Sequence, residues 1–214
     1  MDHVKKLAAS IGVIPVIKID DADKAVQLAQ ALKNGGIPCA EVTFRTADAL
    51  RAMEKISEKV PDVLLGAGTV LLAEQVDRAI DAGARFIVSP GINPKVVDHC
   101  LKRSIPIFPG CVTPTEIEIA LGFGLDTVKF FPAQQAGGLD YIKAVSAPYT
   151  GMKFIPTGGI NLKNLGQYIS NPRITACGGS YMATGDMIAG ERWDEISDLC
   201  RQSLEIVRAN RKAG

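Results

Sequence analysis

Lys129 lies within an apolar segment, between Val128 and the pair Phe130-Phe131, which is an unusual setting for a lysine. Side chains alternate between the two faces of a strand, so Lys129 would share a face with Thr127 and Phe131. Burial disfavours the charged form of an amine and leaves its lone pair free to attack a carbonyl carbon. A lysine at a strand end whose ammonium group reaches water explains the same pattern. The segment alone therefore leaves both interpretations open.

A second segment with possible chemistry, E-V-T-F-R-T at residues 41–46, ends another apolar run. The carboxylate of Glu41, if it lies near a buried lysine, could move protons through a water molecule. The planar guanidinium of Arg45 matches the geometry of a carboxylate or a phosphate. A structural ion pair between Glu41 and Arg45 is the alternative interpretation.

The elements that must position these residues alternate along the whole chain. Short apolar runs predict strands at residues 13–17, 39–43, 63–67, 86–89, 105–108, 127–131, 153–156 and 174–177. Helical periodicity predicts helices at residues 21–34, 47–59, 73–82, 94–102, 113–122, 138–145, 161–169 and 193–210. Asn161 is expected to cap the seventh of these helices, a short turn with Met187 and Ile188 to precede the last, and His3 to lie in a frayed N-terminus.

Eight strand–helix units predict an α/β protein with a single (β/α)8 TIM barrel domain over residues 1–214. No linker rich in Pro, Gly or Ser divides the units. In such a barrel the active site lies at the C-terminal ends of the strands. A doubly wound open sheet is the alternative, but it usually has a Gly-rich motif after the first strand, where this chain has K-I-D-D at 18–21.

Two glycine-containing segments, Gly158-Gly159 and Gly178-Gly179-Ser180, follow the seventh and eighth predicted strands. Glycine allows backbone amides to approach a ligand, and helix N-termini favour anions. Barrels often bind phosphate at these two loops, so the pair of segments predicts a phosphorylated ligand. Tight turns between strand and helix are the alternative interpretation.

Charge and composition argue against several other classes of protein. With 24 basic and 23 acidic residues, the chain shows no basic excess, so no nucleic-acid partner is expected. No apolar run near the N-terminus could act as a signal peptide or a membrane span, and no membrane partner is expected. The five cysteines form no C-x-x-C pair, which is typical of reduced thiols in a cytoplasmic protein. His3 and His99 are too few and too far apart for a catalytic zinc site.

The motifs, taken in order, resemble the class I 2-keto-3-deoxy-6-phosphogluconate (KDPG) aldolase family, whose members often also act as 4-hydroxy-2-oxoglutarate (KHG) aldolases. The resemblance covers residues 13–206 and rests on E-V-T-F-R-T at 41–46, G-A-G-T-V at 66–70, S-P-G at 89–91, V-K-F-F-P-A at 128–133, P-T-G-G-I at 156–160 and G-G-S at 178–180. It implies a homotrimeric lyase of the Entner-Doudoroff pathway. Such an enzyme acts on a small 2-keto acid and uses no metal and no cofactor.

The resemblance also implies roles for individual residues. In the family, the lysine of K-F-F-P forms a Schiff base with pyruvate, which corresponds to Lys129 here. The glutamate of E-V-T-x-R is the general acid/base, which corresponds to Glu41. The arginine of that motif and the threonine of G-A-G-T hold the pyruvate carboxylate, and these are Arg45 and Thr69.

Other positions are expected to bind the rest of the substrate. Thr157 would contact substrate hydroxyl groups, and Pro90 and Phe131, from two further motifs, would line the substrate site. The resemblance assigns the phosphate to four residues, Gly158, Gly159, Gly179 and Ser180.

One departure from the family and several rival functions bear on these expectations. Many relatives read F-P-A-E after the lysine, whereas this chain has Gln134-Gln135 in place of the acid. A phosphogalactonate aldolase is one rival, but relatives of that type often lack the arginine found here as Arg45. A phosphate-binding isomerase or a non-catalytic phosphosugar-binding barrel would keep the glycine loops without requiring both Lys129 and Glu41.

Overall fold

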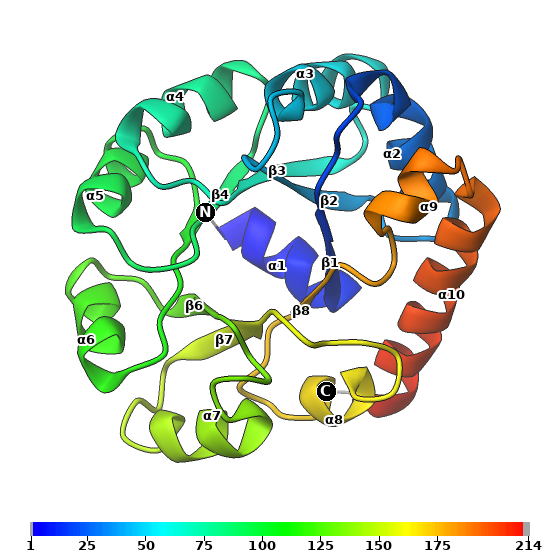
Figure 1. Cartoon of the computed structure of the whole chain (residues 1–214). Coiled ribbons are helices and arrows are strands. Elements are labelled where there is room, and N and C mark those ends of the chain that lie inside the picture. The colour runs from blue at the N-terminus through cyan, green and yellow to red at the C-terminus, as the bar shows by residue number, and fades with distance from the viewer. Residues whose placement is uncertain (1, 212–214) are drawn as a thin grey trace.

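Parallel strands form a closed ring in the computed structural model, which describes residues 2–211 (Figure 1). The ring within these residues consists of β1 (Val13–Ile17), β2 (Cys39–Thr43), β3 (Leu64–Gly68), β4 (Phe86–Val88), β5 (Ile107–Phe108), β6 (Thr127–Phe130), β7 (Lys153–Pro156) and β8 (Cys177–Gly179). Hydrogen bonding gives the order β5-β4-β3-β2-β1-β8 and pairs β6 with β7. Bridges between Gly110 and Lys129 and between Thr157 and Gly178 join the two sets. The (β/α)8 barrel is therefore confirmed. The predicted domain also includes residues 1 and 212–214, which lie outside the described residues.

Helices surround the ring, so that the strands are covered on their outer side (Figure 1). They are the 3₁₀ turn η1 (Ala22–Lys24) with α2 (Ala25–Asn34), α3 (Ala49–Lys59), α4 (Ala73–Asp81), α5 (Pro94–Lys102), α6 (Pro114–Gly122), α7 (Gly138–Ser146), α8 (Leu165–Ile169), α9 (Gly185–Ala189) and α10 (Trp193–Asn210). Proline begins both α5 and α6, where its missing N–H costs nothing. The side chains of Asn93 and Thr113 accept hydrogen bonds from the first turns of these two helices.

An additional helix, α1 (Asp2–Ile11), lies across the centre of the ring in Figure 1. Its side chains Val4, Ala8 and Ile11 are buried, at a spacing that places them on one helical face. Because α1 ends just before β1 begins, it covers the N-terminal end of the barrel. The prediction of a frayed N-terminus was therefore wrong. The helix is hard to recognise in the sequence because its apolar stripe is short and interrupted by polar residues.

Most predicted boundaries lie within about two residues of those observed, and two others differ more. The last strand covers residues 177–179 rather than 174–177, because its pairing with β1 starts at Cys177 and Ile174 forms only an isolated bridge to β7. Gly178 and Gly179 therefore belong to the strand, although glycine is unfavourable in strands. The predicted helix at 161–169 is reduced to α8 at 165–169. The prediction that Asn161 caps this helix was wrong, because the N-cap is Asn164 and Asn161 instead turns the chain by accepting a hydrogen bond from the Lys163 amide.

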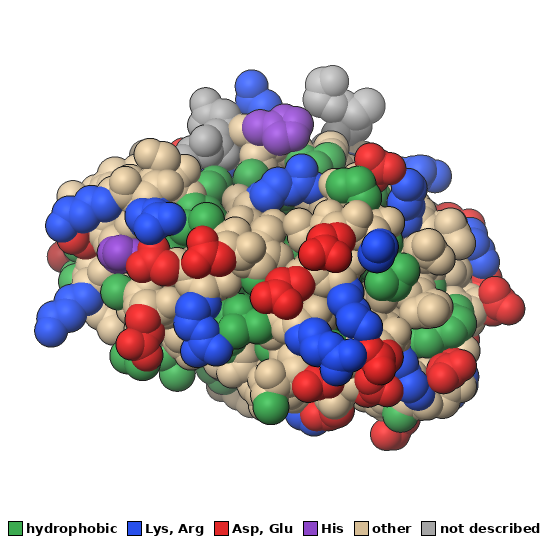
Figure 2. All heavy atoms as spheres, turned by 90° about the horizontal axis from the view of Figure 1, so that it is seen from above, with side chains coloured by type: hydrophobic (Ala, Val, Ile, Leu, Met, Phe, Trp, Pro, Cys, Tyr) green, Lys and Arg blue, Asp and Glu red, His purple; other side chains and the backbone are tan. Residues whose placement is uncertain are grey.

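The outer surface carries acidic and basic side chains close together. Figure 2 shows them interspersed over one side of the barrel, without a basic stripe on that face. Within residues 2–211, the structure contains no helix with the length and hydropathy needed to span a membrane.

Candidate active site

A pocket of about 140 Å³ opens at the C-terminal ends of the strands. Its lining comes from residues on or just after every strand except β5 and consists of Val16, Glu41, Thr43, Arg45, Thr69, Pro90, Lys129, Phe131, Thr157, Gly158, Gly159, Ile160, Gly178 and Ser180. The barrel thus brings together every predicted site residue except Gly179. Gly179 belongs to β8 but does not line the pocket, and the preceding Gly178 does.

Lys129 and Glu41 face one another inside this pocket. The Lys129 Nζ lies 3.3 Å from the Glu41 Oε1, and the two residues are only 6% and 3% exposed. Lys129 comes from β6 and Glu41 from β2, on different sides of the ring. The interpretation of Lys129 as a strand-end lysine with its charge in water is therefore wrong. An amine held beside a carboxylate can lose a proton to it and then attack a carbonyl carbon.

Phe131 and Pro90 form part of the pocket wall around this amine. The Lys129 Nζ lies 5.2 Å from the centroid of the Phe131 ring, within the range of a cation–π contact. The Phe131 side chain is partly open to solvent at the pocket mouth, whereas Phe130 points the other way into the core. This alternation agrees with the faces predicted for the strand.

Arg45 lies close to the pair but does not form the structural ion pair considered above. Glu41 pairs with Lys129 instead, and among residues 2–211 no carboxylate lies within 4.0 Å of the Arg45 guanidinium. The Arg45 Nε donates to the hydroxyl of Thr43 at 3.2 Å. The two terminal nitrogens remain able to form the paired hydrogen bonds that arginine makes with a carboxylate.

Thr69 adopts an unusual backbone conformation at the pocket, with φ at 59°. A β-branched residue rarely adopts a positive φ, and such strain is often found where a residue contacts a ligand. The preceding Gly68 lacks a side chain where β3 passes Glu41. A Cβ there would lie 2.3 Å from the Glu41 Oε1, so glycine leaves the space that the carboxylate occupies.

The turn after β7 lines the pocket with residues 158 to 160. Gly158 and Gly159 have φ values of 99° and 77°, which only glycine adopts readily. Within residues 2–211, no backbone carbonyl accepts a hydrogen bond from the N–H groups of residues 158 to 160. Successive free amides of this kind form a concave anion site. The exposed side chain of Ser180 lines the same pocket, and its hydroxyl could add a donor.

Gln134, the position at which many relatives have an acid, lies behind this turn. Its Nε2 donates to the Tyr168 hydroxyl at 2.8 Å. Burial raises the pKa of the Tyr168 phenol, so this group stays neutral and can accept the bond. A Cβ at Gly159 would lie 2.5 Å from the Gln134 Cγ, which shows how closely the side chain packs on the turn. Gln134 thus supports the turn from outside the pocket.

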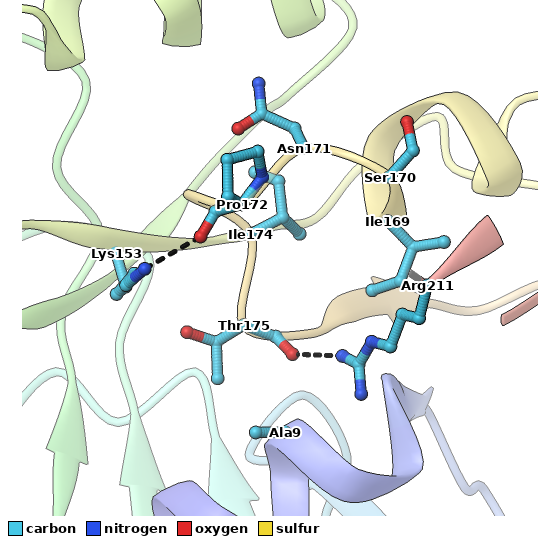
Figure 3. A pocket seen from close by; sticks show the side chains of 9 residues that line it. All are labelled: Ala9, Lys153, Ile169, Ser170, Asn171, Pro172, Ile174, Thr175 and Arg211. Carbon is cyan, nitrogen blue, oxygen red and sulfur yellow. Dashed lines mark hydrogen bonds between the residues drawn. The ribbon is translucent and has the colours of Figure 1, made fainter. Parts of the chain in front are cut away.

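A larger hollow of about 450 Å³ lies at the opposite end of the barrel (Figure 3). Two basic side chains line it, but both donate to backbone carbonyls: Lys153 to Pro172 at 2.7 Å and Arg211 to Thr175 at 2.6 Å. These contacts fasten the segment that leads into β8. The hollow carries no pair comparable to Lys129 and Glu41 among its lining residues, so we place the chemistry in the smaller pocket.

Reasoning from the sequence gave no individual role to four pocket residues, namely Val16, Thr43, Ile160 and Gly178. The place of Thr43 in the site could have been predicted, because Thr43 is two residues from Glu41 on the same strand and must share its face. The role of Gly178 could not, because it depends on Thr157. A Cβ at Gly178 would lie 2.2 Å from the Thr157 hydroxyl oxygen, so only glycine leaves that hydroxyl in place.

Comparison with known proteins agrees with this geometry. Residues 4–199 match the family described as KDPG and KHG aldolase. A Treponema pallidum (strain Nichols) protein named 2-dehydro-3-deoxy-phosphogluconate aldolase is 51% identical over 197 residues, covering 92% of this chain and 94% of that protein.

Two solved structures have the same fold. A KDPG aldolase from Legionella pneumophila, with pyruvate captured as a covalent carbinolamine intermediate, has a TM-score of 0.89 and 41% identity, over 92% of this chain and 96% of that chain. A 2-keto-3-deoxy-6-phosphogluconate aldolase from Zymomonas mobilis, solved with 3-phosphoglycerate, has a TM-score of 0.88 and 36% identity, over 99% of this chain and 98% of that chain. The chain therefore belongs to the KDPG and KHG aldolase family.

Proposed function

We propose that this protein is a class I aldolase that cleaves 2-keto-3-deoxy-6-phosphogluconate to pyruvate and glyceraldehyde 3-phosphate. A second reaction, the cleavage of 4-hydroxy-2-oxoglutarate to pyruvate and glyoxylate, would use the same groups. The observation that carries the proposal is the buried Lys129 amine 3.3 Å from the buried Glu41 carboxylate. A non-catalytic phosphosugar-binding barrel would have no use for this pair, whose burial costs desolvation energy.

The proposed reaction begins when the Lys129 amine attacks the C2 carbonyl of the keto acid, giving a carbinolamine that loses water to form an iminium. Glu41, acting through a water, accepts the proton of the C4 hydroxyl. The C3–C4 electron pair then moves into the iminium, the C3–C4 bond breaks and the aldehyde leaves. The resulting enamine takes a proton at C3, and hydrolysis of the iminium releases pyruvate and the free amine. Each proton taken by the carboxylate is thus returned within one cycle.

Groups on either side of the pair would hold the substrate. Arg45 and Thr69 would bind the carboxylate, so that C2 faces the amine. The N–H groups of Gly158 and Gly159, with the Ser180 hydroxyl, would bind the phosphate. Positioning of this kind supplies several kcal/mol in enzymes, because the reacting atoms meet without further loss of freedom.

Thr157 and the remaining glycines complete the proposed substrate site. Thr157 lines the pocket immediately before the phosphate turn, and its hydroxyl would contact a substrate hydroxyl. Gly178 keeps that hydroxyl in place, and Gly179 supports the start of the loop that carries Ser180. Pro90 and Phe131 would shield the imine from water.

We further infer a single barrel domain over residues 1–214 that assembles as a homotrimer in the cytoplasm and serves the Entner-Doudoroff pathway. The two exposed side chains Leu71 and Leu72, in the loop after β3, support association because a partner copy could cover them. All five cysteines are buried free thiols, which supports a reducing compartment. Light scattering of the purified protein measures the number of subunits directly.

Trapping with borohydride tests the proposed chemistry. Incubation of the protein with pyruvate and sodium borohydride should add one reduced pyruvate to Lys129, and peptide mass spectrometry should locate it there. The Lys129→Arg variant, which keeps the charge, should take up none. Aldolase activity without an adduct at Lys129 would refute the Schiff-base mechanism. A comparison of kcat/KM for the phosphogluconate and phosphogalactonate substrates should favour the former, since Arg45 is present.

A further inference from the structure

Thr43 has no role in the mechanism above, yet it lines the pocket. It is the last residue of β2, two positions from Glu41, and is 2% exposed. Its hydroxyl donates to the Ile17 carbonyl oxygen at 2.8 Å and accepts a hydrogen bond from the Arg45 Nε at 3.2 Å. The hydroxyl thus joins β1 to the arginine that faces the pocket.

The chemistry of a hydroxyl fixes the direction of both bonds. A threonine hydroxyl has one proton, and the bond to Ile17 uses it. Only lone pairs therefore remain toward Arg45, and in the structure they accept from its Nε. Because threonine is β-branched, its side chain has few alternative rotamers in a strand. The Arg45 backbone N–H also donates to the Thr43 carbonyl at 2.8 Å, so both ends of the arginine are tied to this residue.

Occupation of the Nε decides which way the guanidinium points. Arginine has a long side chain with many rotamers, and a ligand that binds it must restrict them. With the Nε held by Thr43, the two terminal nitrogens, which make no hydrogen bond within residues 2–211, stay free for a ligand. A carboxylate in place of Thr43 would also hold Arg45, but it would neutralise the charge that a ligand needs. A neutral acceptor orients the guanidinium and leaves its charge available.

We propose that Thr43 is a positioning residue that sets the affinity of the site for the carboxylate of the keto acid by orienting Arg45. This proposal rests on the proposed function, in which Arg45 binds that carboxylate. Two residues of β2 would then have different roles. Glu41 would transfer protons, and Thr43 would affect only the binding of the keto acid. Loss of the Thr43 hydroxyl should therefore weaken pyruvate binding and leave the chemical steps nearly unchanged.

Thr43→Val tests this proposal, because valine has the shape of threonine without the hydroxyl. The pyruvate concentration that gives half-maximal borohydride adduct at Lys129 should rise about 5- to 20-fold, the range expected for a weakened hydrogen bond to a charged group. The kcat should change by less than about 3-fold. Thr43→Ser, which keeps the hydroxyl, should stay close to wild type. Acetone, which has no carboxylate, should give the same adduct yield in Thr43→Val as in wild type.

Thr127→Val is a matched control. Thr127 is also a buried strand threonine, 4% exposed, two residues from Lys129, and its hydroxyl bonds to Asp126 rather than to a pocket residue. It should leave the half-maximal pyruvate concentration unchanged. If Thr43→Val does not fold, as judged by circular dichroism, Thr43→Ala removes the same hydroxyl with a smaller side chain and should show the same shift.

A double-mutant cycle decides whether Thr43 acts through Arg45. In an Arg45→Ala background, Thr43→Val should cause no further rise, because the group it orients is gone. An equal rise in both backgrounds, or a parallel loss with acetone, would overturn the proposal and leave Thr43 with a structural role. Absence of an adduct in the wild-type protein would instead refute the proposed function, before any variant is compared.

Discussion

Gly68 carries no side chain at the point where β3 passes Glu41, and this makes it a sensitive place to disturb the catalytic pair. We predict that Gly68→Ala moves the Glu41 carboxylate without unfolding the barrel. The added Cβ would lie 2.3 Å from the Glu41 Oε1, 2.7 Å from its Cγ and 2.8 Å from its Cδ. The first contacts are all with the end of one flexible side chain, which can move while the backbone stays. The φ of Gly68 is not positive, so alanine is compatible with the backbone.

The size of the effect follows from these distances. Cβ atoms essentially never approach another heavy atom within 3.0 Å, so the Oε1 must retreat by about 0.7 Å or more. The carboxylate now lies 3.3 Å from the Lys129 Nζ, and any such movement changes that contact. A misplacement of about 1 Å in an active site can reduce the rate about 100-fold. We therefore expect kcat to fall about 10- to 100-fold, with a loss of stability of about 1 kcal/mol.

The assay must separate a displaced Glu41 from a damaged fold. Gly122→Ala is the control, because a Cβ at Gly122, the end of α6, would meet no atom within 4 Å. Steady-state kinetics should show the loss of kcat only in Gly68→Ala, and borohydride should still trap pyruvate on Lys129 in that variant. A Gly68→Ala protein with wild-type kcat would refute the reasoning. Equal losses of trapping and turnover would place the effect on Lys129 instead of Glu41.

Three further predictions concern the proton carrier, the phosphate and the thiols. Glu41→Gln keeps the side-chain shape but cannot accept a proton, so kcat should fall about 100-fold or more while the pyruvate adduct still forms in mass spectrometry. Ser180→Ala should raise KM for the phosphorylated substrate about 3- to 10-fold and leave KM for 4-hydroxy-2-oxoglutarate unchanged; an equal rise for both would argue against a phosphate contact. Burial raises the pKa of the Cys111 thiol to about 12, so at pH 8 it stays protonated and a thiol-specific disulfide reagent should modify it only after denaturation. Rapid reaction of native Cys111 would show that this part of the barrel opens easily.

The eight-unit pattern of the sequence predicted the barrel because each strand is a run of apolar residues followed by an amphipathic helix. The same pattern placed Lys129 and Glu41 at the mouth, since every strand of a parallel barrel ends on one side. It could not show that Glu41 would meet Lys129 rather than Arg45. Two residues four apart in one segment look like natural partners, whereas the observed partner lies 88 residues away and is brought close only by closure of the ring.

The errors at β8 and at Thr43 have a common physical cause. Propensity treats Gly178-Gly179 as a loop, because a glycine in a strand contributes no packing of its own. In the barrel, Gly178 belongs to the strand because it pairs with Ile14 of β1, and the position needs glycine because the Thr157 hydroxyl lies where a Cβ would be. Thr43 likewise looks like an ordinary strand residue in the sequence. Its importance comes from the hydrogen bonds of its hydroxyl to Ile17 on β1 and to Arg45 beyond the strand end. The local sequence indicates which residues carry the chemistry. The roles of residues such as Gly178, which leaves space for a side chain, and Thr43, which orients one, depend on contacts between strands that form only in the closed barrel.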